Sequence, residues 1–168
     1  GLIGSNKAVS LQKQIHMSSL TQKDKKAISI AMDLDINHYA LSFASNSNDV
    51  DSLRLLIGKE RFIISKIEST IGLKNIESIC LSSDAVLIDR GDLTRQVPIE
   101  KLPLLQKQII KIAKRLKTKV YVATNLMESM ITNIQPTRAE VNDVFNTLSD
   151  GADGLVLAAE TAIGKHPI

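Results

Sequence analysis

Residues 62–88 read FIISKIESTIGLKNIESICLSSDAVLI, two short apolar runs separated by an amphipathic stretch. Each apolar run is nearly continuous rather than alternating, which is typical of parallel strands that are covered on both faces. The stretch between the two runs has the spacing of an amphipathic helix. This part of the sequence therefore predicts a strand–helix–strand unit of a right-handed α/β fold.

The same alternation continues in both directions along the chain. The predicted strands are His38–Ser42, Phe62–Ile67, Ala85–Ile88, Val120–Ala123 and Gly154–Leu157. The predicted helices are Thr21–Leu34, Asn48–Ile57, Ile71–Leu81, Ile99–Leu116 and Thr137–Ser149. Thr21 and Asp24 have the spacing of a capping box at the start of the first helix. Residues 1–20 show no clear period, so we expect an incoming segment or linker there and one domain over residues 21–168.

Composition is that of a globular protein. The 168 residues carry 21 Lys+Arg against 18 Asp+Glu, and 43% of them are hydrophobic, which excludes disorder as the main state. Balanced charge and scarce aromatic residues argue against nucleic acid as a partner. No apolar run approaches the roughly 20 residues of a membrane span, so no membrane contact is expected. The single cysteine, Cys80, suits a reducing cytoplasm. Because the chain opens at Gly1 rather than Met, we expect an excerpt or a trimmed product.

Parallel α/β folds place their chemistry at the carboxyl ends of the strands. Lys66 and Glu68 lie two apart on a predicted strand, so both side chains point to one side. Asp92 follows the next strand and could join Glu68 in binding a hard divalent cation. A lysine beside such a cation would stabilise negative charge that develops on a substrate oxygen. A structural ion pair between Lys66 and Glu68 explains the same spacing, and spacing alone does not decide.

Longer stretches carry a resemblance to a known family. They are SKIESTIGLKNIESI (65–79), DAVLIDRGDLTRQVP (84–98), KVYVATNLMESMITNIQPTRAEVNDVFNTLSDGAD (119–153) and GLVLAAETAIGKHP (154–167). These stretches resemble pyruvate kinase, in that family's order and at its spacing, and the PTRAEVNDV run is especially specific. Upstream, GSNKAVSL (4–11) resembles the segment that re-enters the barrel from the family's cap domain. The resemblance implies a partial (β/α)₈ barrel of about five parallel strands alternating with helices.

The resemblance also implies an activity. In the complete enzyme it would be phosphoryl transfer from phosphoenolpyruvate to ADP, a glycolytic reaction that yields pyruvate and ATP. Lys66 would be the catalytic cation at the transferring phosphoryl group. Glu68 and Asp92 would bind Mg²⁺ or Mn²⁺.

The same resemblance implies the substrate-binding residues. Gly91 and Asp92 would present backbone amides to the substrate carboxylate. Thr124 would lie against the substrate and take part in proton delivery to the enolate. Ser42 and Glu160 would line the site.

Departures from the family pattern lie on the phosphate and nucleotide sides. Asp89 stands where the family usually has alanine, and Ala158 and Ala159 replace a serine and a glycine. Three barrel strands, the cap domain and the residues of the family's potassium site are absent from these 168 residues. We therefore expect the chain alone to be inactive. Since five strands leave open edges, it should self-associate, pair with the missing part of a barrel, or collapse into a shortened α/β sheet with its helices rearranged, and we favour association.

Two alternatives remain open from the sequence. One is a metal-dependent lyase, or another enzyme that acts on pyruvate or enolpyruvate without ADP. The other is a catalytically inactive relative that serves as a binding or assembly module.

Overall fold

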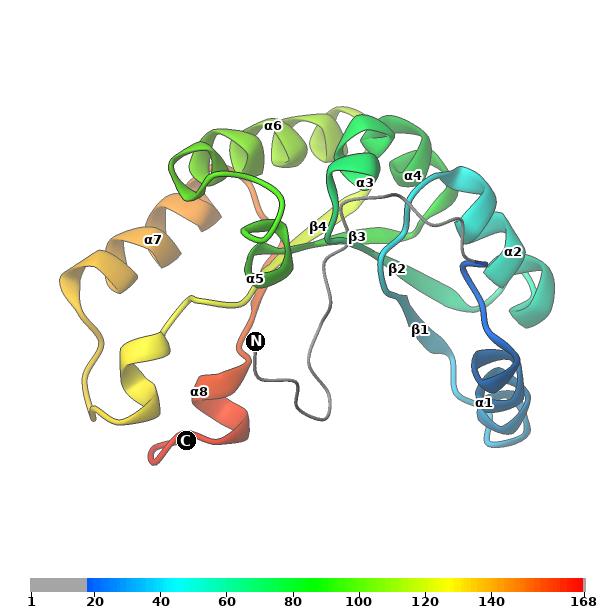
Figure 1. The fold of residues 1–168 in the computed structure, drawn as a ribbon, viewed down its shortest axis with the longest axis horizontal. Helices are drawn as coiled ribbons and strands as arrows, with labels where there is room; N and C mark the ends of the chain where they lie inside the picture. Colours follow the sequence, from blue (N-terminus) through cyan, green and yellow to red (C-terminus); the bar gives the residue numbers. More distant parts are fainter. Residues whose placement is uncertain (1–17, 168) are drawn as a thin grey trace, which may run out of the picture.

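The computed structural model describes residues 18–167, which form one arched parallel sheet with helices along its convex side (Figure 1). The strands lie in chain order: β1 His38–Leu41, β2 Phe62–Ile67, β3 Ala85–Asp89, β4 Lys119–Ala123 and β5 Gly154–Val156. All four neighbouring pairs are parallel. The predicted strands are confirmed, each with ends that differ by one residue at most. This is an arc of a barrel, as predicted.

The longer helices precede or connect these strands. They are α1 Gln22–Asp33, α2 Ser47–Ile57, α3 Thr70–Lys74, α4 Ile76–Ser82, α6 Leu102–Arg115 and α7 Arg138–Ser149. Four short elements follow strands or precede a helix: α5 Arg90–Leu93, η1 Ile99–Lys101, η2 Glu128–Ile131 and α8 Ala159–Ala162. The capping box of Thr21 and Asp24 is confirmed, and Thr137 and Glu140 form a second one at the start of α7.

One predicted helix is wrong, because the structure has two shorter helices in its place. The stretch Ile71–Leu81 is divided at Asn75 into α3 and α4. The Asn75 side chain donates a hydrogen bond of 2.8 Å to the carbonyl oxygen of Ser45, in the loop before α2. An asparagine bonded in this way competes with the helical backbone for hydrogen bonds, and the apolar period continues on both sides of it. The break was therefore not visible in the pattern.

The core lies between the sheet and the helices on its convex side. Ile63, Val86 and Val122 are fully buried there, against residues of α2, α4 and α6 such as Ile79. Full burial of each such side chain contributes about 1.5–3 kcal/mol. Val156, the last residue of β5, is 38% exposed instead. It pairs in register with Ala123, on the opposite face of the sheet from the helices.

The two ends of the sheet are open within the described residues, because β1 and β5 each pair with one neighbour only. Near β5, helix α7 exposes Val141, Phe145 and Leu148, which share one face of the helix. None of the helices within residues 18–167 combines the length and apolar character that a membrane span requires. The predicted cap-domain segment (4–11) and most of the predicted incoming segment (1–20) lie outside the described residues.

Candidate functional site

Lys66 is the centre of a charged cluster at the carboxyl ends of β2 and β3. Its Nζ lies 2.6 Å from Oε1 of Glu68 and 3.1 Å from Oδ2 of Asp89. The register explains this meeting, because Lys66 pairs with Leu87 and Asp89 stands two residues further along the same face. Burial opposes the charge of Lys66, but the hydrogen bonds and charges of Glu68 and Asp89 outweigh it, so the pKa of Lys66 is raised above its ordinary value. The ammonium group therefore stays protonated at neutral pH.

Glu68 is the most deeply buried member of the cluster, with a side chain only 1% exposed. Burial raises its pKa above the ordinary range, against the opposing hydrogen bonds from Lys66 and from the Phe43 amide. Phe43 follows β1 and has a φ of 52°, a left-handed conformation that is unusual for a large side chain. The Glu68 carboxylate is thus held between the Lys66 ammonium group of β2 and the backbone amide of Phe43.

Three carboxylates meet beside Lys66. Glu68, Asp89 and Asp92 each offer an oxygen, and these oxygens lie within 4.8 Å of one another. Carboxylate oxygens are the ligands that Mg²⁺ and Mn²⁺ take in proteins, and sites with one or two carboxylates leave room for substrate and water. The donor set therefore fits a hard divalent cation. Arg95 also reaches Asp92, at 3.3 Å, and is itself half exposed.

Thr124 and Gly91 meet at the same edge of the sheet. The Gly91 amide donates a hydrogen bond of 2.8 Å to Oγ1 of Thr124. That hydroxyl oxygen also lies 3.3 Å from Oδ1 of Asp89. A Cβ added to Gly91 would lie 3.4 Å from Thr124 Oγ1, at the tight end of normal contact. The glycine thus keeps space free beside the Thr124 hydroxyl.

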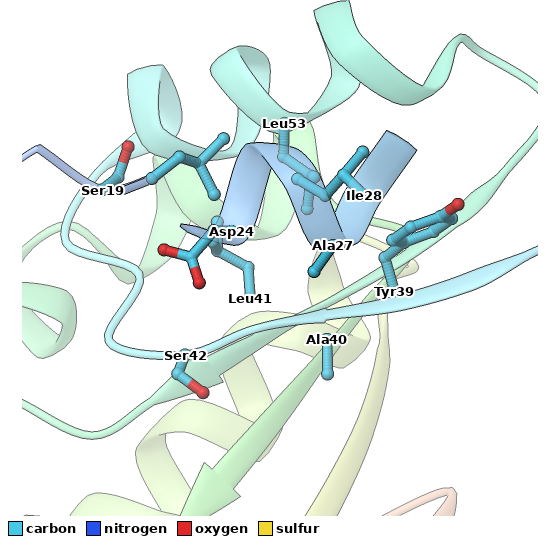
Figure 2. A pocket seen from close by; sticks show the side chains of 10 residues that line it. Ser19, Asp24, Ala27, Ile28, Tyr39, Ala40, Leu41, Ser42 and Leu53 are labelled. Carbon is cyan, nitrogen blue, oxygen red and sulfur yellow. The ribbon is translucent and has the colours of Figure 1, made fainter. Parts of the chain in front are cut away.

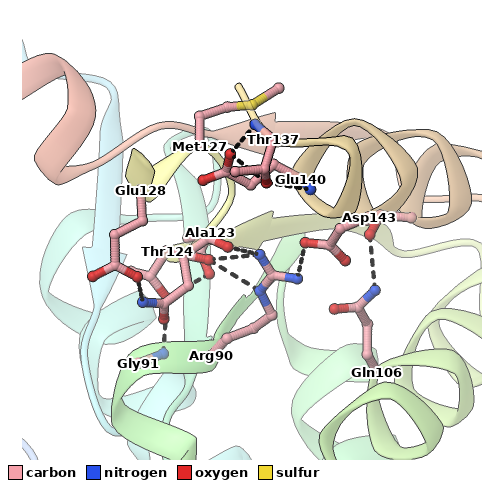
Figure 3. A network of polar contacts seen from close by, with 12 residues as sticks. Arg90, Gly91, Gln106, Ala123, Thr124, Met127, Glu128, Thr137, Glu140 and Asp143 are labelled. Carbon is pink, nitrogen blue, oxygen red and sulfur yellow. Dashed lines mark hydrogen bonds and ion pairs between the residues drawn. The ribbon is translucent and has the colours of Figure 1, made fainter. Parts of the chain in front are cut away.

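Arg90 fixes the turn that carries Thr124 (Figure 3). Its Nη2 donates hydrogen bonds of 2.8 Å to the carbonyl oxygens of Thr124 and Asn125, and its Nη1 lies 2.7 Å from Asp143 of α7. Thr124 and Asn125 have φ values of 69° and 53°, a strained conformation for residues other than glycine. Arg90 is 6% exposed, so its guanidinium group makes these hydrogen bonds away from solvent. The sequence pattern did not indicate this role of Arg90.

Two predicted site residues lie apart from the cluster. Glu160 is buried, and its carboxylate accepts hydrogen bonds from the amides of Met127 and Ala158, which joins the segment after β5 to the loop before η2. Ser42, directly after β1, is exposed and lines a cavity of about 240 Å³ between α1 and β1 (Figure 2). The structure thus brings together Lys66, Glu68, Gly91, Asp92 and Thr124, but not these two.

A comparison with protein families decides the relationship. The model of the pyruvate kinase barrel domain matches residues 1–168. The chain belongs to the pyruvate kinase family. It is 45% identical to the pyruvate kinase of Thermotoga maritima over 157 residues, which are 92% of this chain and 34% of that protein.

Other pyruvate kinases are similarly close. The chain is 44% identical to that of Methanocaldococcus jannaschii over 158 residues, 92% of this chain and 35% of the relative. It is 39% identical to that of Mycobacterium tuberculosis over 172 aligned positions, 100% of this chain and 36% of the relative. The chain therefore spans about a third of the length of the pyruvate kinases it matches.

Asp89 is the residue that sequence reasoning missed as a member of the site. The resemblance to pyruvate kinase identified it only as a departure from alanine. Strand periodicity was the available signal, because residues alternate between the faces of a strand and Asp89 shares its face with Leu87, the register partner of Lys66. That partnership, however, requires the register between two strands, which the sequence does not state.

Proposed function

We propose that this segment forms the metal-binding and phosphoryl-binding side of a pyruvate kinase site. In the complete protein the reaction would be phosphoryl transfer from phosphoenolpyruvate to ADP, which yields pyruvate and ATP. The observation that carries the proposal is the position of Lys66 Nζ, between two carboxylates and beside a third. Membership of the pyruvate kinase family supports it.

Each residue has a physical task in this proposal. Glu68 and Asp92 would hold Mg²⁺ or Mn²⁺, which when bound supplies positive charge at the phosphoryl and enolate oxygens. Lys66, protonated at neutral pH, stabilises negative charge on the phosphoryl group during transfer. Thr124 takes part in delivery of a proton to the enolate carbon. The amides of Gly91 and Asp92 bind the substrate carboxylate.

The same proposal implies what the protein binds and where it is located. Substrates would be small molecules, with neither nucleic acid nor membrane as partner, and the cytoplasm is the expected location. The residues of the family's potassium site would come from outside this segment. Electrostatic stabilisation of a phosphoryl group requires donors on several sides, so these 168 residues alone should not catalyse the transfer. They should self-associate or pair with the rest of a barrel.

Two assays test the proposal. In the complete protein, Lys66→Ala should abolish pyruvate formation from phosphoenolpyruvate and ADP, whereas Lys111→Ala, a change to an exposed lysine on α6, should not. In the 168-residue chain, Glu68→Ala and Asp92→Ala should each weaken Mn²⁺ binding, measured by calorimetry. Full activity of Lys66→Ala would contradict the phosphoryl-transfer role. Unchanged Mn²⁺ affinity in both carboxylate variants would contradict the metal site.

A metal-dependent lyase that acts on pyruvate or enolpyruvate is the second candidate. The cluster of Lys66 with three carboxylates favours it, because all of these groups lie on one side of the site and none requires a nucleotide. Turnover of an enolpyruvate substrate that does not depend on ADP would support this candidate. Metal binding without turnover in the complete protein would instead indicate a binding or assembly module.

A further inference from the structure

Asp89 is the member of the cluster whose carboxylate has the most varied partners. Oδ2 lies 3.1 Å from Lys66 Nζ, while Oδ1 lies 3.4 Å from the Asp92 amide and 3.3 Å from Thr124 Oγ1. An ammonium group, a backbone amide and a hydroxyl group are the donors that a protein uses to bind a carboxylate ligand. The Asp89 side chain is only 10% exposed, so its carboxylate lies among these three donors rather than extending into solvent.

These partners are the groups to which a carboxylate substrate would bind. The proposed function assigns the substrate carboxylate to the amides of Gly91 and Asp92. The Gly91 amide already donates to Thr124 Oγ1, and the Asp92 amide already faces Asp89 Oδ1. A ligand carboxylate that reaches the Asp92 amide must therefore displace the side chain of Asp89 or lie directly against it. Two carboxylates at that distance repel each other.

The net charge of the cluster also indicates that Asp89 disfavours a carboxylate ligand, independently of the individual contacts. Glu68, Asp89 and Asp92 carry three negative charges and Lys66 one positive charge, so a divalent cation makes the group neutral. Without the charge of Asp89, the same cation leaves one positive charge, which attracts an anion. Arg95 adds the same charge in both cases and is half exposed, where solvent weakens its effect.

We propose that Asp89 is a specificity-determining residue, whose carboxylate fills the carboxylate-binding position of the site. It strengthens the retention of a divalent cation and weakens the binding of every carboxylate ligand, from dicarboxylates to phosphoenolpyruvate and pyruvate, each of which must displace the Asp89 side chain or lie against it to reach the Asp92 amide. This inference rests on the proposed function, since it uses the same metal site. It goes further by naming the ligand class that this chain disfavours and the residue responsible.

The test compares two variants with the wild-type 168-residue chain. Asp89→Ala removes the carboxylate, and Asp89→Asn keeps its shape while removing its charge. Asp51→Asn, at an exposed position on α2, is the matched control for net charge. Calorimetry measures Mn²⁺ affinity first and then the affinity for oxalate, a small dicarboxylate, at saturating Mn²⁺. Circular dichroism checks that each variant is folded.

The expected results follow from one unit of charge at close range. Both Asp89 variants should bind Mn²⁺ about tenfold more weakly and oxalate about tenfold more tightly than wild type, and the control should match wild type. Oxalate affinity within about twofold of wild type in both variants, or no detectable oxalate binding in any of them, would overturn the proposal. A purely structural ion pair predicts that outcome, with lowered stability alone.

The Glu68→Ala variant distinguishes an error in the role of Asp89 from an error in the proposed function. If it abolishes Mn²⁺ binding while the Asp89 variants behave as wild type, the metal site stands and only the role of Asp89 is wrong. If both Glu68→Ala and Asp92→Ala leave Mn²⁺ binding intact, the metal site itself is wrong.

Discussion

The centre of the sheet and its two edges follow the same strand–helix pattern, yet they position polar residues differently. Lys66, Asp89 and Thr124 belong to β2, β3 and the end of β4, and each contacts another member of the cluster. Ser42 after β1 and Glu160 after β5 contact none of them. A central strand is fixed from both sides by its neighbours, whereas an edge strand in this segment has one neighbour only. The side chains that five strands bring together are therefore those of the central strands, and from the edge strand β1 the site receives a backbone contact, the Phe43 amide bonded to Glu68.

Breaking the centre should have the largest effect. Arg90→Ala leaves Asp143 and two carbonyl groups without their partner and releases the strained turn at Thr124. Arg90 is buried but Asp143 is 35% exposed, so the cost comes mainly from the carbonyl groups left without a donor, and we expect the free energy of unfolding to fall by about 2–3 kcal/mol. Urea denaturation measures it. Arg90→Lys, which keeps the charge but not the planar group, should lie between wild type and alanine.

A loss below about 1 kcal/mol for Arg90→Ala would contradict this account, because it would show that the turn is stable without the guanidinium group. Mn²⁺ titration of the same variant gives a second readout. If Arg90 acts by positioning the turn at Thr124, the change should leave Mn²⁺ affinity intact, since none of the three carboxylates bonds to Arg90 in the described residues.

We expect the open edges of the sheet to cause self-association of the chain. Phe145 is 66% exposed on α7, beside the open end of the sheet, and Val141 and Leu148 lie on the same face. Light scattering over a dilution series should give masses above the 18.4 kDa of a single chain at the higher concentrations. Phe145→Ser should move that transition to higher concentration by about tenfold, equivalent to about 1.4 kcal/mol. Leu55→Ser, a change at an exposed apolar position on α2, is the control.

A mass of 18.4 kDa at every concentration would show that the open edges do not cause association. Transitions that move equally in Phe145→Ser and Leu55→Ser would instead place the contact elsewhere than on α7.

The same contrast explains what sequence could predict. All five strands were predicted because buried parallel strands are continuous apolar runs, a local feature. Lys66, Glu68 and Asp92 were predicted together because Lys66 and Glu68 lie at the end of one predicted strand and Asp92 follows the next predicted strand. The contacts of Arg90 join residues 34 and 53 positions apart, and no local pattern carries that information. Asp89 needed the register of β2 and β3, which depends on how the sheet packs.

Glu140 offers a smaller, pH-dependent test away from both regions. Hydrogen bonds from Ser129 and Thr137 outweigh the opposing effect of burial and lower the pKa of Glu140 to about 2. A carboxyl group whose pKa is lowered by folding adds stability above its ordinary pKa and loses it as the pH falls toward the folded value. The free energy of unfolding should therefore decline between about pH 4.5 and about pH 2, and Glu140→Gln should flatten that decline.

At neutral pH the glutamine variant should lose about 1 kcal/mol, the usual value of a helix cap. Glu60→Gln, an exposed change, serves as the control, and urea denaturation across the acid range is the measurement. An unchanged acid decline in Glu140→Gln would assign the decline to other carboxylates.

The smallest effect is expected at the edge of the sheet, and it sharpens the comparison most directly. Ser42→Ala removes a hydroxyl group that is exposed after β1, so the free energy of unfolding should change by less than about 0.5 kcal/mol. Thr124→Ala removes a hydroxyl group of similar size from the centre, where it accepts from the Gly91 amide, and should cost about 1–2 kcal/mol. Mn²⁺ affinity should stay at the wild-type value in Ser42→Ala. If Ser42→Ala proved as costly as Thr124→Ala, or weakened Mn²⁺ binding, then a side chain after β1 would contribute to the site in addition to the Phe43 amide that already bonds to Glu68, and the division between centre and edge would fail.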